Sequence, residues 1–266
     1  MKAIRLNEEG EEVKILQRLL NKWGFVIDVT GKFDAPTQVA VKRFQELNNL
    51  PMDGIVGDMS WETLQDEQKI EVAKLRVHET DFIRAAKALG VEVAAVKAVK
   101  EVETGGRGGF FAIGKPAILF EGHIFWSQLK QVGKNPEEYV KGNENILYSK
   151  WTKTHYVGGI REYERLEKAM AIDETAAKKS ASYGLFQIMG FNYEVCGCSN
   201  VDEFVSIMSE NEGRQLDLFV SFLQGNGWDK FLKTLDWTKF ARYYNGPGYA
   251  KNKYDELLKK AYLKHK

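Results

Sequence analysis

Hydrophobic positions recur every three or four residues along most of the chain, which is the spacing of one face of an α-helix. In residues 1–68 this spacing predicts three short helices separated by turns that contain glycine. The apolar positions that we expect to form their shared core are Val13, Leu16, Leu19, Leu20, Ala40, Val41, Phe44, Leu47, Trp61 and Leu64. Asp34 and Asp58 precede the second and third helices, where an aspartate side chain caps free backbone N–H groups. The pattern therefore predicts a small three-helix bundle.

Residues 69–266 continue the helical pattern and predict a larger, mainly α-helical domain. Its first amphipathic stripe stops at Gly90, and a second helix over residues 91–103 ends at a glycine-rich turn. The segment 116–122 is a short apolar run bounded by Pro and Gly, which favours an extended strand. No Pro or Gly separates the two domains, so we expect a short helical connection near residue 70.

The helix over residues 91–103 carries two glutamates that face opposite ways. At 100° per residue, Glu103 lies within about 40° of Val96 and Val99, whereas Glu101 lies at least about 140° from both. Glu103 is thus on the apolar face, at the negative end of the helix dipole, and both conditions favour its protonated form. A glycosidase needs such a carboxyl as its general acid near neutral pH.

Four segments between residues 80 and 260 together resemble a phage-type N-acetylmuramidase family, whose members are endolysins with a lysozyme-like catalytic domain. They are K-A-V-K-E-V-E-T-G-G, G-K-P-A-I-L-F-E-G-H-I-F, Y-G-L-F-Q-I-M-G-F-N and Y-Y-N-G. The second segment is the most diagnostic, because generic lytic transglycosylases lack it. The sequence departs from the family at Pro247-Gly248, which alters the loop after the last segment.

The resemblance implies two catalytic carboxyl groups. Glu103 matches the proton donor, and Glu121 in the second segment is the leading second carboxylate. Glu121 acts either as a base toward water or as a stabiliser of the oxocarbenium-like transition state, unless it is a buried structural carboxylate. His123, two residues further on, is a candidate substrate-binding residue and a candidate hydrogen-bond partner of Glu121.

The resemblance also implies substrate-binding residues. Tyr183 and Gln187 are expected on the wall of a cleft, where the glutamine amide can bind sugar acetamide or hydroxyl groups. Tyr244 and Asn245 are expected to face the substrate or Glu103, with Tyr243 as the alternative tyrosine. Because aromatic faces bind apolar sugar surfaces, the tryptophans of this domain are further candidates. These are Trp126, Trp151, Trp228 and Trp237.

The N-terminal bundle resembles a peptidoglycan-binding domain of the three-helix type. The resemblance rests on V-K-I-L-Q-R-L-L, G-K-F-D-A-P-T-Q-V-A-V-K-R-F-Q and D-G-I-V-G-D-M-S-W-E-T-L, and covers nearly the whole module. It implies bacterial peptidoglycan as the partner. Such a module raises the effective concentration of an enzyme at an insoluble substrate.

Composition and charge fit this interpretation. The chain is 44% hydrophobic and 28% charged, as is typical of a soluble globular protein. Residues 1–66 contain eight Lys/Arg and eleven Asp/Glu, net −3, which leaves thirty against twenty-six, net +4, in the remainder. A mildly positive catalytic half suits an anionic cell-wall polymer. We expect no nucleic-acid partner and a monomeric protein.

Neither a metal nor another cofactor is expected. Cys196 and Cys198 are one residue apart, a poor geometry for a bridge, so both should be free thiols. The four histidines show no metal-ligand spacing. The first residues lack the apolar run of a signal peptide, and no segment has the roughly 18 apolar residues of a membrane span. We therefore expect synthesis in the host bacterial cytoplasm, no stable membrane insertion, and holin-assisted release to the cell wall.

The resulting hypothesis is a modular peptidoglycan hydrolase that cleaves the β-1,4 bond between N-acetylmuramic acid and N-acetylglucosamine by general acid catalysis. Two alternatives remain open. A lytic transglycosylase would use a similar single acid but would form 1,6-anhydro ends. A non-catalytic wall-binding or virion structural protein would bind peptidoglycan without cleaving it.

Overall fold

The computed structural model describes residues 1–266, with the exception of the side chain of Pro247. Its internal contacts divide the chain into two compact units, Met1–Thr80 and Asp81–Lys266. The division lies twelve residues beyond the boundary that we expected after residue 68. The reason is a fourth helix, whose buried Ile70 belongs to the core of the first unit.

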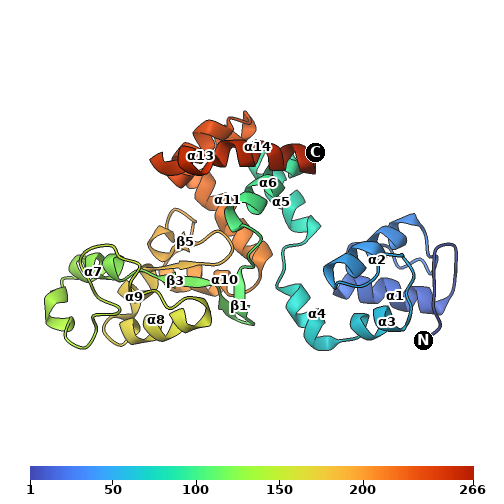
Figure 1. Ribbon diagram of the computed structural model, residues 1–266, viewed down its shortest axis with the longest axis horizontal. Coiled ribbons are helices and arrows are strands. Elements are labelled where there is room, and N and C mark those ends of the chain that lie inside the picture. Colours follow the sequence, from blue (N-terminus) through green and yellow to red (C-terminus); the bar gives the residue numbers. More distant parts are fainter. The chain divides into compact units, whose positions relative to one another are not determined.

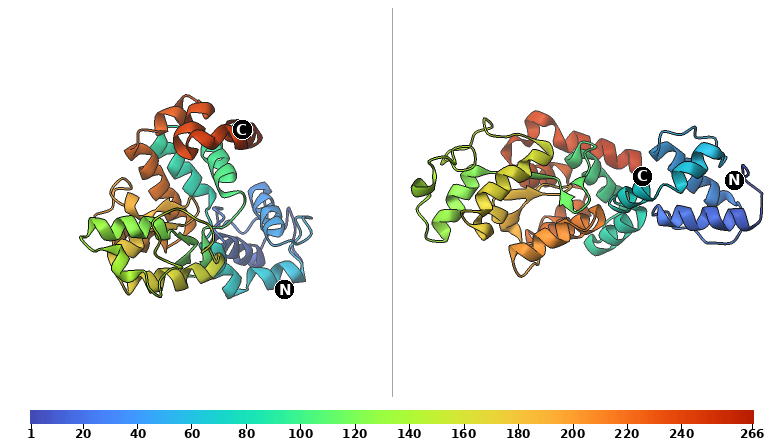
Figure 2. Two further views of the ribbon diagram at one scale, coloured as in Figure 1. Left: turned by 60° about the vertical axis from the view of Figure 1, so that its left-hand side comes forward. Right: turned by 90° about the horizontal axis from the view of Figure 1, so that it is seen from below.

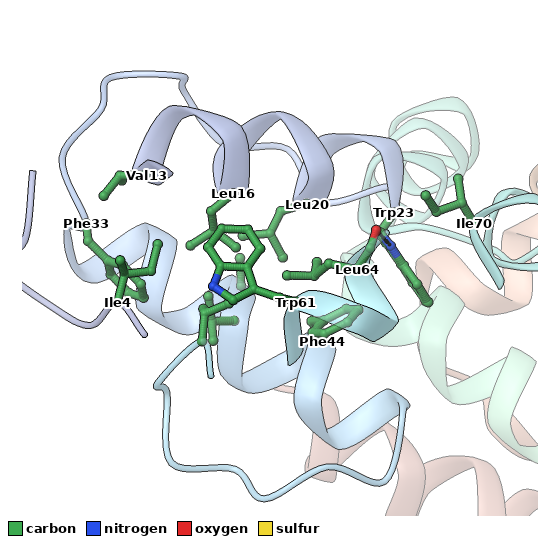
Figure 3. Packing of buried hydrophobic residues seen from close by; sticks show 13 residues of the cluster. Ile4, Val13, Leu16, Leu20, Trp23, Phe33, Phe44, Trp61, Leu64 and Ile70 are labelled. Carbon is green, nitrogen blue, oxygen red and sulfur yellow. Dashed lines mark hydrogen bonds between the residues drawn. The ribbon is translucent and has the colours of Figure 1, made fainter. Parts of the chain in front are cut away.

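The first unit contains the three expected helices and this additional one, which Figure 1 shows in blue to cyan. Their bounds are α1 (Glu11–Lys22), α2 (Ala35–Leu47), α3 (Asp58–Leu64) and α4 (Glu67–Lys74). Figure 3 shows how their apolar faces meet in one core, in which Leu16, Phe44 and Leu64 are fully buried. Trp23 packs edge-on against Phe44 and donates its indole N–H to the carbonyl of Leu64. The predicted three-helix core is thus present and is extended by α4. The assignment of Leu47 to this core was wrong, because it is the last residue of α2 and 61% of its surface is exposed.

Capping differs between the two aspartates named above. Asp34 accepts a hydrogen bond from the backbone N–H of Thr37 and caps α2, as expected. The prediction for Asp58 was wrong, because Gly57 occupies the N-cap position and no side chain caps α3. Asp58 is instead the first residue of the helix, where its charge stabilises the positive end of the helix dipole.

Two buried glutamines hold the turns of the first unit in the same way. The carbonyl oxygen of Gln17 accepts from the N–H of Gly31 at 2.9 Å, and that of Gln45 accepts from Gly54 at 2.9 Å. Each amide also donates to the backbone of the same turn, to the carbonyls of Lys32 and Ile55. The repeated glycine turns in the sequence are therefore repeated in the structure as turns hydrogen-bonded to the preceding helix.

In the second unit, one group of helices is built around α6 (Val93–Thr104), which lies alongside α14 (Tyr254–His265) (Figure 1). α13 (Trp237–Asn245) packs on α14 and on α12 (Asp229–Lys233). α5 (Glu79–Leu89) precedes α6 and buries Ala85, Ala86 and Leu89, as the apolar stripe predicted. This group carries Glu103 at one helix end and Asn245 at another.

A second group of helices surrounds a small antiparallel sheet made of β3 (Ile118–Phe120), β4 (Ala181–Tyr183) and β5 (Ile188–Met189). The neighbouring helices are α7 (Gly122–Gln131), α8 (Glu162–Met170), α9 (Glu174–Lys179), α10 (Val201–Met208) and α11 (Glu212–Gly225). A separate hairpin consists of β1 (Phe110–Ala112) and β2 (Lys115–Pro116), and short 3-10 turns are η1 (Pro136–Tyr139), η2 (Gly159–Arg161), η3 (Gly190–Asn192) and η4 (Pro247–Asn252). Figure 2 shows these elements from two further sides.

Of the strand predicted over residues 116–122, residues 118–120 form β3, whereas Pro116 ends β2 and Gly122 begins α7. β3 pairs with β4 in the register Ile118 to Tyr183 and Phe120 to Ala181, which sets the Glu121 segment beside the Y-G-L-F-Q segment. Cys196 and Cys198 are both free, as predicted, and both are buried. Among the described residues, none of the helices combines the length and the apolar character that crossing a membrane requires.

Candidate active site

Glu103 occupies the last turn of α6, which ends in the left-handed residues Gly105 and Gly106 (φ 54° and 79°). Its side chain is partly buried, and burial raises the pKa of this carboxyl to about 7. The side-chain amide of Asn245 donates a hydrogen bond to Oε1 of Glu103 at 3.1 Å, which lowers the pKa and so opposes part of the rise. At neutral pH a large fraction of Glu103 is thus protonated and can donate a proton.

Glu101 confirms the opposite character of the other helix face. It is hydrogen-bonded to Lys264 at 2.9 Å and to the ring of His265 at 2.8 Å, both on α14. The hydrogen bonds from these two residues lower its pKa. Glu101 is therefore an ionised partner in an interhelical cluster of charges, and Glu103 is the acid suited to proton donation.

The Y-Y-N-G segment at the end of α13 separates into three environments. Tyr244 is half-buried and donates its hydroxyl to the carbonyl of Phe186 at 3.3 Å. Burial and the nearby charge of Glu103 raise the pKa of Tyr244. Asn245 is the residue that contacts Glu103, whereas Tyr243 is exposed and stacks on Phe231. Among these three residues, the structure thus assigns the hydrogen bond with Glu103 to the asparagine.

The Y-G-L-F-Q segment forms a turn that needs its glycine. Gly184 has φ 71°, and a Cβ atom there would lie 2.6 Å from the side chain of Gln215. Gln215 accepts a hydrogen bond from the N–H of Leu185 at 2.7 Å and donates to the carbonyl of Gly109 at 3.2 Å. This buried glutamine therefore ties the turn to the glycine-rich loop that follows Glu103. Its role could not be read from the sequence, where Gln215 is one polar residue in a helical pattern.

The assignment of Tyr183 to the wall of a cleft was wrong. Only 1% of its surface is exposed, because it lies in β4, packs edge-on against Phe204, and donates its hydroxyl to the carbonyl of Lys178. Gln187, by contrast, is exposed. Its amide nitrogen donates to the carbonyls of Ala117 and Gly184, and its oxygen accepts from the hydroxyl of Ser182. The side chain of Gln187 thus shapes the turn, and its contact with sugar stays a prediction.

Glu121 follows β3 at the N-cap position of α7 and has a partner that the sequence did not indicate. The hydroxyl of Tyr156 lies 2.8 Å from each carboxylate oxygen of Glu121. Burial, followed by the hydrogen bond to Glu121, raises the pKa of Tyr156, so this hydroxyl stays protonated and donates. Tyr156 lies in an irregular segment without a periodic pattern, which explains why no sequence signal identified it.

The predicted hydrogen bond between His123 and Glu121 is not formed. Nδ1 of His123 lies 3.3 Å from Oε2 of Glu121, but the two atoms lack hydrogen-bonding geometry. This nitrogen is buried and has no other partner in the part of the chain that the structure describes. His123 is therefore next to the carboxylate without being bonded to it.

A buried ion pair between Arg165 and Glu162 contacts the backbone next to Glu121. Arg165 donates to Glu162 at 2.7 Å and to the carbonyl of Phe120 at 2.8 Å, and both charged side chains are almost fully buried. Glu162 also accepts from the backbone N–H groups of Val157 and Gly158. Burial by itself would raise the pKa of Glu162, but these hydrogen bonds and the charge of Arg165 outweigh it and hold the pKa low. The pair thus fixes the end of β3 to the segment that contains Tyr156.

The described residues contain no group of three or more His, Cys, Asp or Glu side chains that could hold a metal ion. The chemistry available to the side chains identified above is that of a protonated carboxyl at a helix end and a second carboxylate at a strand end. Together with the mainly helical fold, these two groups are the ones that a lysozyme-type glycoside hydrolase requires.

Comparison with known proteins gives the family. Residues 92–266 match the model of the N-acetylmuramidase family, and the chain belongs to this family. Residues 9–64 match a putative peptidoglycan binding domain. The crystal structure of the endolysin of Burkholderia phage AP3 is similar over 99% of each chain, with 36% sequence identity and a TM-score of 0.70. No match is found among curated proteins.

These matches confirm the predicted arrangement of an N-terminal peptidoglycan-binding domain and a muramidase domain. The protein is a modular peptidoglycan hydrolase of the endolysin type. The alternative of a non-catalytic wall-binding protein is not the one that the comparisons support.

Proposed function

We propose that the enzyme hydrolyses the β-1,4 bond between N-acetylmuramic acid and N-acetylglucosamine, with Glu103 as the general acid. The observation that carries this proposal is the partly buried carboxyl of Glu103, whose pKa of about 7 leaves a proton to donate at neutral pH. Asn245 orients the carboxyl through its hydrogen bond to Oε1.

In the proposed reaction, Glu103 transfers its proton to the glycosidic oxygen while the bond to the anomeric carbon breaks. The sugar gains oxocarbenium character, and a water molecule attacks the anomeric carbon. We assign Glu121 as the base that takes a proton from this water, since the Tyr156 hydroxyl holds its carboxylate in place. The products are a new reducing end on N-acetylmuramic acid and a free hydroxyl on N-acetylglucosamine.

The proposed substrate contacts are Gln187, Tyr244, Asn245 and His123. Gln187 is exposed at the turn after β4, and Tyr244 and Asn245 end the helix that contacts Glu103. The ring of His123 lies beside Glu121 with its Nδ1 buried, so the proposed contact with sugar is made by the rest of the ring. These positions support recognition of N-acetylhexosamine hydroxyl and acetamide groups, which need hydrogen-bond donors and acceptors of this kind.

We further propose that the enzyme acts as a monomer and stays in the host bacterial cytoplasm until a holin allows its passage to the cell wall. The similarity to a phage endolysin over 99% of both chains supports the location before release. The match of residues 9–64 to a peptidoglycan binding domain supports attachment to the wall during cleavage.

The proposal is tested by digesting purified peptidoglycan with the wild type, Glu103→Gln and Glu101→Gln, and identifying the ends of the fragments by mass spectrometry. Glu101→Gln is the matched control, because it makes the same change two residues away on the other face of α6. We expect reducing N-acetylmuramic acid ends from the wild type and the control, and none from Glu103→Gln. Anhydro ends would identify a lytic transglycosylase instead, and unchanged cleavage by Glu103→Gln would refute its role as the acid.

A further inference from the structure

The structure distinguishes among the four tryptophans of the catalytic unit that are candidates for binding sugar. Trp237 is buried, with 7% of its surface exposed, and Trp228 packs edge-on against Phe222 and Tyr244. Trp126 is partly covered within α7. Trp151 alone among the four is exposed over more than half of its surface, at 59%. A large apolar ring that remains in water is the one available for a ligand.

The segment that carries Trp151 is anchored at several points although it has no regular secondary structure. Ile146 and Leu147 are buried, and the hydroxyl of Tyr148 accepts a hydrogen bond from the N–H of Gly122 at 3.3 Å. Arg165 donates to the carbonyl of Asn145 at 3.0 and 3.1 Å. The exposed ring thus projects from a fixed base, and less conformational entropy is lost when it binds a ligand.

Two contacts connect this ring to Glu121. The indole of Trp151 lies close enough to the hydroxyl of Tyr156 to lower the pKa of this tyrosine, against the larger effect of burial. The same hydroxyl lies 2.8 Å from both carboxylate oxygens of Glu121. Because the ammonium group of Lys153 lies over one face of the ring, the opposite face is the one left to meet a ligand. Trp151 is therefore placed one side chain away from the second carboxylate of the site.

Charge around the ring matches the substrate. Lys150 and Lys153 are exposed next to Trp151, and the ammonium group of Lys153 lies 5.7 Å from the centre of the ring. Peptidoglycan strands carry acidic groups on their stem peptides, so a cationic border favours them over a neutral glycan. The pairing of an apolar ring with flanking cations is that expected for a sugar that bears an acidic substituent.

We propose that Trp151 forms a saccharide-stacking subsite beside Glu121, on which an N-acetylhexosamine ring of a peptidoglycan strand packs. This inference rests on the proposed function and adds a substrate-binding residue to it. The stack would hold the sugar near Glu121. It would mainly increase the affinity for the substrate, because the ring itself takes no part in proton transfer.

Binding is measured with the full-length Glu103→Gln variant, which binds the strand without cleaving it under the proposal. The probe is a soluble tetrasaccharide of alternating N-acetylglucosamine and N-acetylmuramic acid with its stem peptides. Its binding is measured by calorimetry and by the change in tryptophan fluorescence. The same titration is repeated with Trp151→Ala, Trp151→Phe and, as the matched control, Trp126→Phe in that background. We expect the fluorescence change to disappear in both Trp151 variants and to persist in Trp126→Phe.

The expected loss of affinity is about tenfold for Trp151→Ala and smaller for Trp151→Phe, which keeps an aromatic face. In the enzyme with Glu103 intact, Trp151→Ala should raise KM by a similar factor and change kcat by less than about threefold. Unchanged affinity, or a fluorescence change that survives in Trp151→Phe, would overturn the inference. Circular dichroism verifies that each variant is folded.

The two proposals fail in different ways. If the wild type releases reducing ends but Trp151→Ala binds and cleaves normally, the subsite is refuted and the proposed reaction stands. If the wild type releases only anhydro ends, the proposed hydrolysis is refuted, while the titration in the Glu103→Gln background still decides whether the strand packs on Trp151.

Discussion

The hydrogen bond from Asn245 to Glu103 makes a prediction about the pH dependence of the enzyme. Asn245→Leu removes the donor, keeps a side chain of similar volume, and leaves the Glu103 carboxylate without this partner. A hydrogen bond to a charged group contributes about 1.5 to 3 kcal/mol. Because this bond is 3.1 Å long and only partly buried, we take the lower end, about 1.5 kcal/mol. That energy corresponds to about one pH unit.

The direction of this change follows from which form the amide stabilises. The Asn245 N–H group stabilises the ionised carboxylate and lowers the pKa of Glu103, whose value is about 7. Without the amide, the pKa rises and Glu103 stays protonated to higher pH. The alkaline limb of the profile of kcat/KM against pH, which reports the acid in the free enzyme, should therefore move up by about one pH unit.

The assay uses soluble, uncross-linked glycan strands across the pH range, so that wall binding does not limit the rate. Asn226→Leu is the matched control, since the Asn226 amide donates to the carbonyl of Phe222 within α11 and has no contact with Glu103. The control should leave the alkaline limb unchanged. An alkaline limb that stays in place or moves to lower pH in Asn245→Leu would refute the reasoning.

Three further changes test the site and its support. The pKa of Glu103 is raised from 4.5 to about 7, so the folded wild type loses stability as the pH rises between these values. Glu103→Gln carries no such charge, and its free energy of unfolding in urea should exceed that of the wild type by up to about 3 kcal/mol near pH 8. This difference should vanish near pH 4. Arg165→Met leaves the buried charge of Glu162 unpaired and should lower the free energy of unfolding, measured by thermal denaturation, by about 3 to 5 kcal/mol. A decrease below about 1 kcal/mol would contradict the role of the pair. Gly184→Ala puts a Cβ 2.6 Å from the side chain of Gln215, at a residue with φ 71°. We expect a lower kcat/KM and a free energy of unfolding reduced by about 1 to 3 kcal/mol. Wild-type values of both would show that the turn tolerates a side chain.

Much of the local structure followed from the sequence, because periodicity reports directly which face of an element is buried. The apolar stripes predicted α1, α2, α5 and α6, and the run bounded by Pro and Gly predicted β3. The same argument separated Glu103 from Glu101, since two residues on one helix differ in direction by a fixed angle. The order of a wall-binding module and a muramidase domain followed from the resemblance of their motifs.

Alternation and capping signals were less decisive where several elements meet. Tyr183 is adjacent to a glycine in a motif that resembles a substrate-binding segment, yet it is a buried residue of β4 that packs against Phe204 of α10. Asp58 has the residue type of a cap but lies one position too late. The local sequence allowed Tyr183 to be exposed or buried, and it allowed Asp58 to be the N-cap or the first residue of α3. The structure around each residue selected one of the two.

What only the tertiary structure decided are contacts between residues far apart in the sequence. Asn245 reaches Glu103 across 142 positions, and the hydroxyl of Tyr156 reaches Glu121 across 35, because helix packing and an irregular segment bring them together. The residue types along the chain determined which groups can donate a proton, bind a sugar or fill a core. The packing decided which of those groups are desolvated and which share a hydrogen bond, and these two conditions set the acidity of Glu103.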